Sequence, residues 1–353
     1  MTLRGAIIGL GNVAVHGHLP GWLARDDVEI VAVTDVYAPR QATLAGTLPR
    51  ARWYASAEEL LLRERLDFVD LCTPPATHAG LITRALEHGL HVLCEKPLVC
   101  SPGELSTVSR LAAAASRVLY TVHNWHHAPI IERTSALLGD GVIGPVQRVV
   151  WQTLRTEPAA AAPGGGTNWR VDPSLSGGGI LTDHGWHVFY VLQRWIGQSP
   201  TAVSALLERR GASALRVEDT ATVRMTFPDA TAELLLTWAS TVRRTWAEIT
   251  GSAGSLRVDD DTIVARHGGR EDRWPCPPAL SAGSTHPDWF HEVAGRFLAA
   301  VTGNAPDRSN LDEASLCVTL ESLARESSRR GAATLALPAL GRPSRPGAAW
   351  APA

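Results

Sequence analysis

An acidic residue and a histidine stand four positions apart directly after three consecutive glycines. The stretch at 177–187 reads GGGILTDHGWH, which places Asp183 and His187 one helical turn apart if the periodic segment HVFYVLQRWIG continues it as a helix. Such a pair can bind a metal ion, transfer a proton, or simply lie at the solvated start of a helix. Other features of the sequence are needed to distinguish these three interpretations of the pair.

A second signature lies near the N-terminus, where Gly9, Gly11 and Ala14 form the pattern G-x-G-x-x-A between a strand-like run and a helical segment. Gly9 permits a tight turn, Gly11 lets backbone approach a pyrophosphate, and Ala14 lets the helix pack close to the sheet. Backbone amides at the helix start, including those of Asn12 and Val13, are suited to phosphate. The pattern predicts a dinucleotide site.

Asp35 ends the second strand-like run, EIVAVTD, where an acidic residue commonly accepts hydrogen bonds from a ribose. A carboxylate there repels a 2′-phosphate, so we expect NAD in preference to NADP. Arg40, one turn into the next helical segment, would weaken this preference if it reached a phosphate. We favour the alternative, an ordinary surface arginine.

The elements that position these groups alternate along the first ~120 residues. Strand-like runs RGAIIGLG, EIVAVTD, FVDLCTP, HVLCEKP and RVLYTV are separated by helical segments at 14–25, 38–48, 77–89 and 102–115. Alternation of apolar strands with helices is typical of a parallel, doubly wound sheet. We therefore expect a Rossmann dinucleotide-binding domain over residues 1–122.

The pattern changes near residue 145 to successive strand candidates without helices between them. These are PVQRVVWQTLRT, AVSALLERR, TATVRMTFP, ATAELLLTWAS, WAEITGS and SLRVDDD, followed by helical segments near 286–303 and 310–330. Adjacent strands favour a mostly antiparallel sheet in an α+β domain over 123–337. We expect the loop at 157–167 to be mobile and the tail at 338–353 to be poorly ordered.

Composition excludes several classes of protein. The 353 residues carry a net charge of −2 with no block of Lys or Arg, which argues against nucleic-acid or membrane-surface partners. The N-terminus lacks the shape of a signal peptide, and no apolar run approaches the ~20 residues of a membrane span. Five scattered cysteines without a CxxC motif indicate a reduced, cytoplasmic enzyme-like protein.

Four motifs occur together in a recognisable order: GLGNVA, CTPPATH at 72–78, CEKPL at 94–98, and NWRVDPSLSGGGILTDHGWH at 168–187. Over about residues 3–330 the chain resembles the glucose–fructose oxidoreductase/inositol dehydrogenase (Gfo/Idh/MocA) family. The resemblance implies a nicotinamide-binding Rossmann domain joined to an open-faced sheet domain. It also implies hydride transfer between nicotinamide and a secondary hydroxyl or keto group of a sugar, cyclitol or related polyol.

The matched positions imply roles for individual residues. Lys96 matches the lysine that hydrogen-bonds the reacting hydroxyl and also borders the cofactor, and an ammonium there stabilises alkoxide charge. His187 matches the base that takes the hydroxyl proton. Asp183 matches a residue that binds substrate or orients this base. Further cofactor contacts are implied for Thr73, Pro74, His78 and Glu95. His78 has two alternatives: it caps the next helix or faces solvent.

Within this resemblance, Gly177–Gly179 are expected to let backbone approach the substrate closely. His184 is expected to be structural or solvent-facing. We expect no metal site, because the Asp183–His187 pair lacks the H-E-x-x-H arrangement and nicotinamide already accepts the hydride.

The chain departs from the family where many relatives read close to GFNYRFNP. Here residues 122–129 read VHNWHHAP, so His126 stands in place of an arginine and cannot form a bidentate fork. Hydroxyl contacts are candidates for His123, Asn124 and His126, and stacking on a sugar ring for Trp125 and Trp169. Arg170 would bind substrate or cross a subunit boundary.

Two alternatives to a dehydrogenase remain open. One is redox-assisted cleavage of a glycosidic bond with bound NAD, and the other is a non-catalytic NAD-binding regulatory protein. An exposed sheet face would leave an apolar patch, so we also expect a homodimer or homotetramer formed through the C-terminal sheet.

Overall fold

The computed structural model describes residues 2–44, 46–161, 168–211, 215–283, 285–303 and 308–338. The chain divides into two compact units. Unit 1 contains Met1–Asn124, Ala159–Gly177 and Gly283–Asp307; unit 2 contains Trp125–Pro158, Gly178–Ala282 and Arg308–Ala353. The units are thus interleaved, whereas continuous domains were expected, because two later segments group with the N-terminal residues. Positions 162–167 of the expected mobile loop and 339–353 of the expected tail lie outside the described residues.

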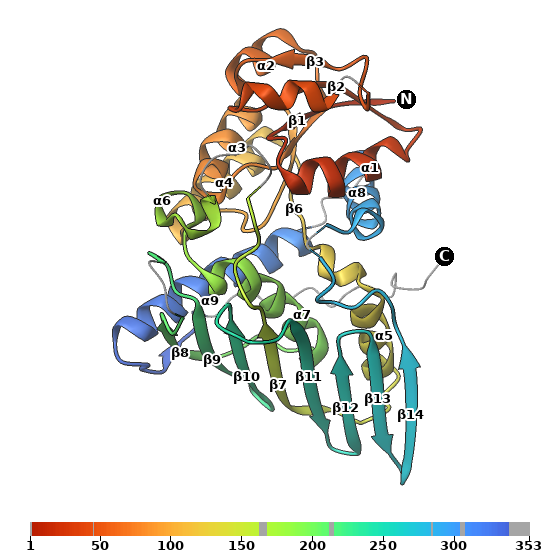
Figure 1. Ribbon diagram of the computed structural model, residues 1–353, viewed down its shortest axis with the longest axis vertical. Helices are drawn as coiled ribbons and strands as arrows, with labels where there is room; N and C mark the ends of the chain where they lie inside the picture. The colour runs from red at the N-terminus through yellow and green to blue at the C-terminus, as the bar shows by residue number, and fades with distance from the viewer. Residues whose placement is uncertain are drawn as a thin grey trace. The chain divides into compact units, whose positions relative to one another are not determined.

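Unit 1 is built on a six-stranded sheet with the order β3-β2-β1-β4-β5-β6; strands β1, β2, β3 and β6 are labelled in Figure 1. Its strands are β1 (Leu3–Ile8), β2 (Val28–Thr34), β3 (Arg52–Tyr54), β4 (Phe68–Leu71), β5 (His91–Cys94) and β6 (Leu119–Thr121). Every neighbouring pair is parallel. This is the strand order of dinucleotide-binding folds, and the order reverses between β1 and β4, where such sheets bind ligands. The predicted Rossmann fold is confirmed.

Unit 1 also contains helical segments, and those that precede β6 connect its successive strands. They are a π-helical turn η1 (Ala14–His18), α1 (Leu19–Leu23), the 3₁₀ segments η2 (Ala38–Leu44), η3 (Pro75–Thr77) and η5 (Trp169–Val171), and the helices α2 (Ala57–Arg63), α3 (His78–Glu87), α4 (Pro102–Ala115), α6 (Pro173–Ser176) and α8 (Pro287–Thr302). The helix expected at 38–48 is a 3₁₀ segment. The core between sheet and helices includes fully buried Ile7, Phe68, Leu93 and Phe297.

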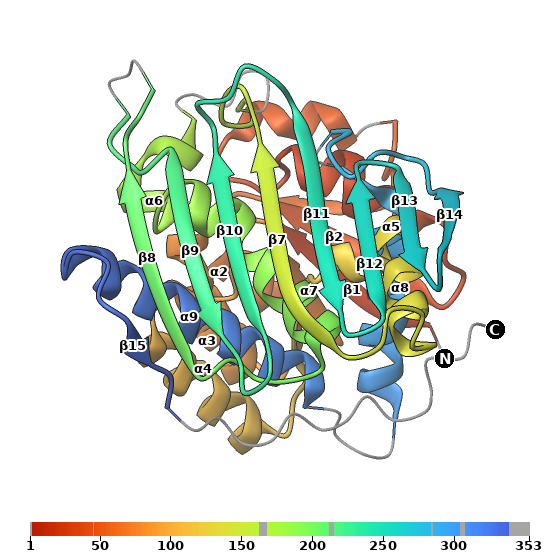
Figure 2. The ribbon, with the colours of Figure 1, turned by 90° about the horizontal axis from the view of Figure 1, so that it is seen from below.

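Unit 2 is built on a nine-stranded sheet with the order β14-β13-β12-β11-β7-β10-β9-β8-β15 (Figure 2). Its strands are β7 (Val146–Leu154), β8 (Ala202–Glu208), β9 (Thr220–Thr226), β10 (Thr231–Thr237), β11 (Arg244–Gly251), β12 (Gly254–Asp259), β13 (Thr262–His267), β14 (Arg270–Pro275) and β15 (Leu335–Ala336). Only β7 and β10 pair in parallel. The prediction of a mostly antiparallel sheet is therefore confirmed.

Helices cover one face of this sheet: α5 (Pro129–Gly139), α7 (Trp186–Ile196) and α9 (Ser309–Arg329), with the short segments η4 (Asn124–His127) and η6 (Leu181–Gly185). The other face is more polar than expected. Thr222, Arg224 and Thr226 of β9 are exposed, and Arg148 of β7 pairs with Glu233 of β10 at 2.9 Å. On β9, exposed polar or charged side chains thus alternate with buried ones.

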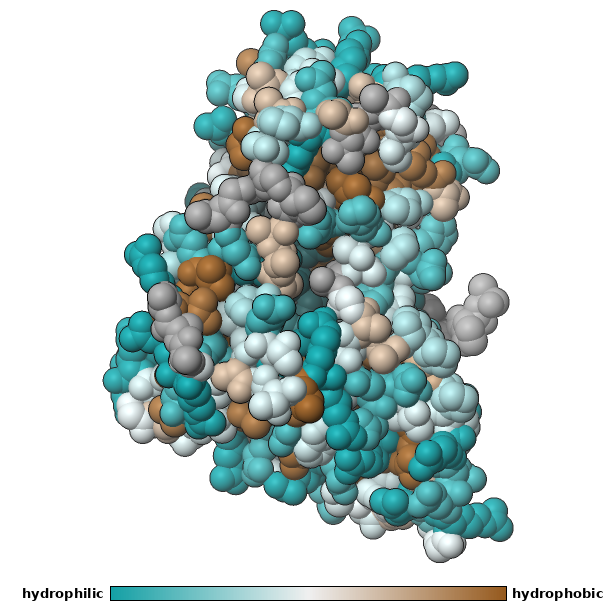
Figure 3. Space-filling model, in the orientation of Figure 1, coloured by the Kyte–Doolittle hydropathy of each residue, from teal (hydrophilic) through white to brown (hydrophobic). Residues whose placement is uncertain are grey.

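Hydrophilic residues predominate on the side of the molecule drawn in Figure 3. Among the described residues, the exposed large hydrophobic side chains are few: Leu23, Val36, Tyr37, Leu62, Leu206 and Val242. No helix in the described parts of the chain is long and apolar enough to cross a membrane.

Candidate active site

The glycine loop after β1 has the geometry that a dinucleotide requires. Gly9 has a φ of +95°, and a Cβ there would lie 2.7 Å from the carbonyl oxygen of Cys72, so only glycine fits the turn. A Cβ on Gly11 would meet no atom within 4 Å, so this backbone borders open space. Ala14 is fully buried at the start of η1. The loop therefore fits a bound pyrophosphate.

Asp35 is fixed beside this loop by three hydrogen bonds. Its carboxylate accepts bonds from the backbone amides of Leu10 and Tyr37 and from Nη1 of Arg40, each at 2.7 Å. Arg40, expected to be an ordinary surface arginine, thus pairs with the acidic residue that is predicted to bind ribose. Its cation partly offsets the negative charge that would repel a 2′-phosphate.

The CEKPL motif places a buried carboxylate directly after β5. Glu95 Oε2 accepts a hydrogen bond from the Lys96 amide at 2.9 Å, and its Oε1 lies 3.1 Å from Nε2 of His18. Burial alone would raise the pKa of Glu95, but the hydrogen bond and charge of His18 and the charge of Lys96 lower it below its ordinary value. The Lys96–Pro97 peptide bond is cis.

His78 joins the CTPPATH and CEKPL loops. Its ring is fully buried, with Nδ1 2.8 Å from the carbonyl oxygen of Pro97 and Nε2 2.8 Å from that of Thr73. Burial lowers the pKa of this imidazole. Because both ring nitrogens face main-chain carbonyls, His78 positions Thr73 and the cis-proline loop. A contact between His78 and the cofactor was expected, but its ring nitrogens are directed at these carbonyls.

His187 is held rigidly within unit 2. It is 6% exposed on α7, and its ring stacks on Trp125 with centroids 4.5 Å apart and planes 8° from parallel. Its Nδ1 lies 2.8 Å from the Tyr190 hydroxyl, which also accepts a hydrogen bond from the Trp125 amide at 3.1 Å. These contacts fix one ring face and Nδ1.

The stacking changes the interpretation of Trp125. It was expected to stack on a sugar ring, but it is buried against His187 and lies 6.2 Å from Trp151, centroid to centroid. One face of this buried indole is therefore occupied by the imidazole of His187.

Asp183 precedes His187 through an irregular turn. Residues Leu181–Gly185 form the π-helical segment η6 before α7 begins, in place of one regular helix. Asp183 Oδ2 lies 3.3 Å from Nδ1 of His184. Single π turns inside helices are frequent at functional sites because they change the direction of the side chains that they carry.

A buried guanidinium near Asp183 had no signal in the sequence. Arg155, directly after β7, is 3% exposed and donates to the carbonyl oxygens of Leu154 and Arg244 and to the Thr245 hydroxyl. Burial and the charge of Arg243 lower its pKa to about 10, while Asp260 and Asp183 act in the opposite direction. The carboxylate of Asp183 therefore lies in the field of a buried cation.

The three glycines before this turn are required by protein packing. Gly177 has a φ of +73°, a Cβ on Gly178 would overlap the Arg325 guanidinium, and a Cβ on Gly179 would overlap the carbonyl oxygen of Glu218. The expectation that they approach substrate is therefore replaced for Gly178 and Gly179, because their backbone lies against neighbouring parts of unit 2.

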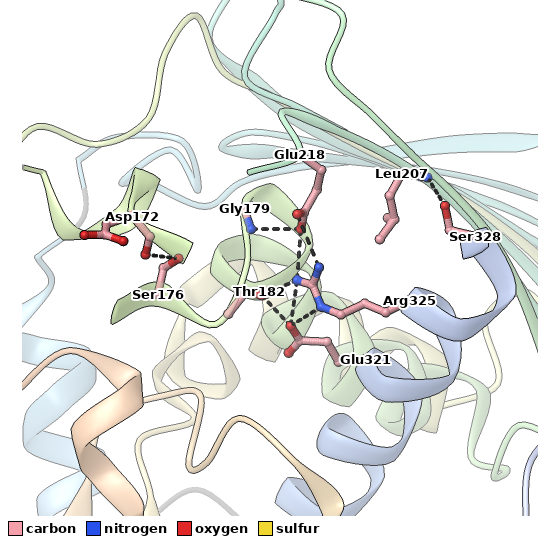
Figure 4. A network of polar contacts seen from close by, with 9 residues as sticks. All are labelled: Asp172, Ser176, Gly179, Thr182, Leu207, Glu218, Glu321, Arg325 and Ser328. Atoms are coloured by element: carbon pink, nitrogen blue, oxygen red, sulfur yellow. Dashed lines mark hydrogen bonds and ion pairs between the residues drawn. The ribbon is translucent and has the colours of Figure 1, made fainter. Parts of the chain in front are cut away.

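A polar network holds this glycine segment (Figure 4). Glu218 Oε1 accepts a hydrogen bond from the Gly179 amide at 2.8 Å and pairs with Arg325 Nη2 at 3.0 Å. Arg325 also donates to Thr182 at 2.6 Å and pairs with Glu321 at 3.0 Å, and Thr182 donates to Glu321. Although burial opposes it, the two carboxylates raise the pKa of Arg325. The network fixes the residues that lead to Asp183.

The residues predicted to contact substrate have different surroundings in the structure. His126 is buried, with Nε2 3.0 Å from Glu313, so this imidazole is paired with an acid of α9 instead of standing ready for a hydroxyl. Trp169 and Arg170 lie together in η5, with the guanidinium carbon 4.4 Å from the indole centroid. Asn124 Oδ1 is buried with no hydrogen-bond partner among the described residues. His123 is 3% exposed.

Comparison with known proteins agrees with this geometry. Residues 3–123 match the family model for oxidoreductases with an NAD-binding Rossmann fold, and residues 131–257 match the GFO/IDH/MocA C-terminal domain.

Two relatives are named as sugar or glucoside dehydrogenases. The chain is 27% identical over 290 residues to D-apiose dehydrogenase of Paraburkholderia graminis, covering 80% of this chain and 74% of that protein. It is 32% identical over 188 residues to D-glucoside 3-dehydrogenase of Escherichia coli, covering 53% of this chain and 52% of that protein. The match thus spans about half the length of the second enzyme.

Solved structures share the fold. An oxidoreductase from Agrobacterium radiobacter, in complex with NAD+, L-tartaric acid and magnesium, superimposes with a TM-score of 0.82 at 20% identity, over 95% of this chain and 98% of that one. Levoglucosan dehydrogenase in complex with NADH gives a TM-score of 0.83 at 18% identity, over 96% and 100%. The chain belongs to the Gfo/Idh/MocA family of oxidoreductases, and its first unit is that family's NAD-binding Rossmann fold.

Proposed function

We propose that the protein is an NAD-dependent dehydrogenase or reductase that acts on a secondary hydroxyl or keto group of a sugar, cyclitol or related polyol. The observation that carries the proposal is His187, a buried imidazole whose ring face and Nδ1 are fixed by Trp125 and Tyr190. A dinucleotide-binding protein without proton chemistry has no need of such a fixed base. The named relatives, which act on D-apiose and D-glucosides, support the substrate class.

The reaction follows from the chemistry of three side chains. In the oxidative direction Lys96 donates a hydrogen bond to the reacting oxygen and stabilises the charge that develops on it. His187 takes the hydroxyl proton at Nε2, and its Nδ1 stays bonded to the Tyr190 hydroxyl. When bound, the nicotinamide of NAD accepts the hydride. In reduction His187 returns the proton, and Asp183 binds substrate or orients the base.

The cofactor site is assigned to residues of unit 1. Gly9, Gly11, Asn12 and Val13 hold the pyrophosphate at the start of η1, and Asp35 binds the adenosine ribose. Glu95, Lys96, Thr73 and Pro74 border the nicotinamide side. Arg40 shares Asp35 with the ribose, which makes the preference for NAD over NADP moderate in size.

We assign binding of the polyol to residues that the sequence predicted and whose side chains could contact it. Asn124 is supported by its buried, unsatisfied side-chain oxygen, which a substrate hydroxyl would satisfy. Trp169 and Arg170 offer an indole and a cation that suit a sugar ring, and His123 remains a candidate. We also propose a homodimer or homotetramer through the unit 2 sheet and a cytoplasmic location.

The test is NADH formation, followed by absorbance, over a panel of inositols, aldoses, amino sugars and sugar acids. We expect stoichiometric NADH with at least one compound, and loss of the signal in His187→Asn and Lys96→Met. His88→Asn, an exposed histidine on the surface of unit 1, is the matched control and retains activity.

Two outcomes contradict the proposal. Glycoside cleavage without net NADH would indicate that oxidation is transient. NAD binding with no turnover on any compound would indicate a regulatory protein.

A further inference from the structure

A second histidine, His18, is enclosed at the end of η1 within unit 1. It is 1% exposed, and its ring stacks on Phe290 of α8 with centroids 3.8 Å apart and planes 16° from parallel. Neither the glycine motif nor the resemblance assigns it a role. Its position is set by the first turn of the dinucleotide loop and by α8.

Both ring nitrogens of His18 face buried carboxylates. Nδ1 lies 2.9 and 3.1 Å from the two oxygens of Asp70, and Nε2 lies 3.1 Å from Oε1 of Glu95. A neutral imidazole carries one N–H and can donate to only one of them, whereas an imidazolium donates to both. Burial lowers the pKa of His18, but the charges and hydrogen bonds of Asp70 and Cys72 together raise it well above its ordinary value.

The remaining groups around the ring are consistent with this charge state. Cys72 Sγ lies 3.2 Å from Nδ1, and burial together with Asp70 raises its pKa to about 12, so it is a neutral thiol. Trp22 Nε1 donates to Asp70 at 2.8 Å. Lys96 is a further charge acting on Glu95.

His18, Asp70 and Cys72 also have the residue types of a metal site. The direct hydrogen-bond distances from Nδ1 of His18 to Asp70 account for this contact without an ion.

We propose that His18 is a positioning residue of the cofactor site, which as an imidazolium links Asp70 to Glu95 and holds the Glu95 carboxylate ready for the nicotinamide-side ribose. This inference rests on the proposed role of Glu95. Asp70 lies within β4, next to β1 where the strand order reverses, so the link connects the sheet interior to the cofactor edge. NAD affinity then weakens as rising pH removes the proton from His18.

The protonation state is tested directly by NMR of histidine-labelled full-length protein at pH 7.5, with His18→Asn used to assign the signal. We expect both ring nitrogens of His18 to carry protons, without change on adding EDTA. A neutral tautomer, or a spectrum that changes on metal removal, would overturn the proposal. This measurement needs neither substrate nor turnover, so it is independent of the proposed reaction.

The consequence for the cofactor is tested by calorimetric titration with NAD between pH 6 and 10. We expect the Kd of the wild-type protein to rise with pH, and the Kd of His18→Asn to be about tenfold higher at pH 7 and to vary little with pH, because a charge-assisted bond to Glu95 is lost. His16→Asn, exposed two residues earlier in η1, is the matched control and binds as wild type. Unchanged affinity in His18→Asn would show that the ring has only a packing role.

Discussion

Two buried histidines, one in each unit, illustrate how partners determine what the same side chain does. His18 lies between the carboxylates of Asp70 and Glu95 and is held as a cation. His187 stacks on Trp125 and bonds to the hydroxyl of Tyr190, which are groups without charge at neutral pH. An imidazolium fixed by two acids cannot accept a proton, whereas a ring fixed by a phenol and an indole can.

Burial alone therefore does not identify a general base. His18 is more deeply buried than His187, at 1% against 6% exposed. The charged partners of the ring distinguish the role that we propose for His18, in cofactor binding, from the proton transfer that we propose for His187.

The largest expected effect comes from making the same substitution, histidine to asparagine, at each of the two sites in turn. His187→Asn should lower kcat about 10²- to 10⁴-fold with little change in the Kd for NAD, because it removes the general base. His18→Asn should do the opposite, raising the Kd for NAD and leaving kcat at saturating NAD nearly unchanged. Steady-state kinetics and calorimetry on both variants measure this crossover, and equal effects on both parameters in both variants would end the distinction.

Asp35→Ser tests the cofactor side without touching either histidine. Removing the carboxylate frees Arg40, now 2.7 Å from it, for a 2′-phosphate, and removes a hydrogen-bond acceptor for ribose. The ratio of kcat/KM for NAD to that for NADP should fall by about one to two orders of magnitude, since charged hydrogen bonds contribute about 1.5–3 kcal/mol. Asp35→Ser with Arg40→Ala should lose the gained NADP activity. An unchanged cofactor ratio in the single variant would remove Asp35 from the ribose site.

Tyr190→Phe tests whether the hydroxyl of Tyr190 orients His187. The change deletes the hydroxyl that bonds Nδ1 and the Trp125 amide, while the aromatic ring remains. We expect kcat to fall about tenfold with an altered pH profile and a nearly constant KM, because orientation of the base is lost but substrate contacts are not. A KM effect with normal kcat would instead place Tyr190 against the substrate.

The smallest expected effect is on stability. The pKa of His18 is raised in the folded protein, so its stabilising contribution is complete below the unfolded value near 6.5 and is lost as pH rises through the folded value. The difference in unfolding free energy between wild type and His18→Asn should therefore shrink from about 2 kcal/mol near pH 6 toward zero in alkaline solution. Denaturant titrations at several pH values measure it, and a constant difference would mean that His18 is neutral when folded.

Much of the fold follows from local patterns. G-x-G-x-x-A, Asp35 and the alternating apolar runs predict the parallel sheet, since strand and helix periodicities differ clearly. The short strand β3 and helix α2 were not predicted, because three residues of strand give no resolvable alternation. Strands β13 and β14 were also missed, since β14 reads REDRWP, which has no apolar face.

The site was predictable as residue types but not as contacts. His78 and Trp125 were expected at the cofactor and the substrate. Instead, His78 contacts the main chain of two loops and Trp125 stacks on His187, because nothing in the sequence shows which carbonyl or ring a side chain meets. Several polar contacts join residues that are far apart in the chain: those of Arg155, of His18, and of the Glu218–Arg325 pair. Such long-range polar pairs carry no local signal.

The central claim, that hydride moves to nicotinamide while His187 takes the proton, is tested most directly with a substrate deuterated at the reacting carbinol carbon. The account predicts deuterium at C4 of the nicotinamide in the NADH formed by the wild-type protein, with the transfer strongly slowed in His187→Asn. NADH without deuterium, or transfer at the wild-type rate in His187→Asn, would contradict it.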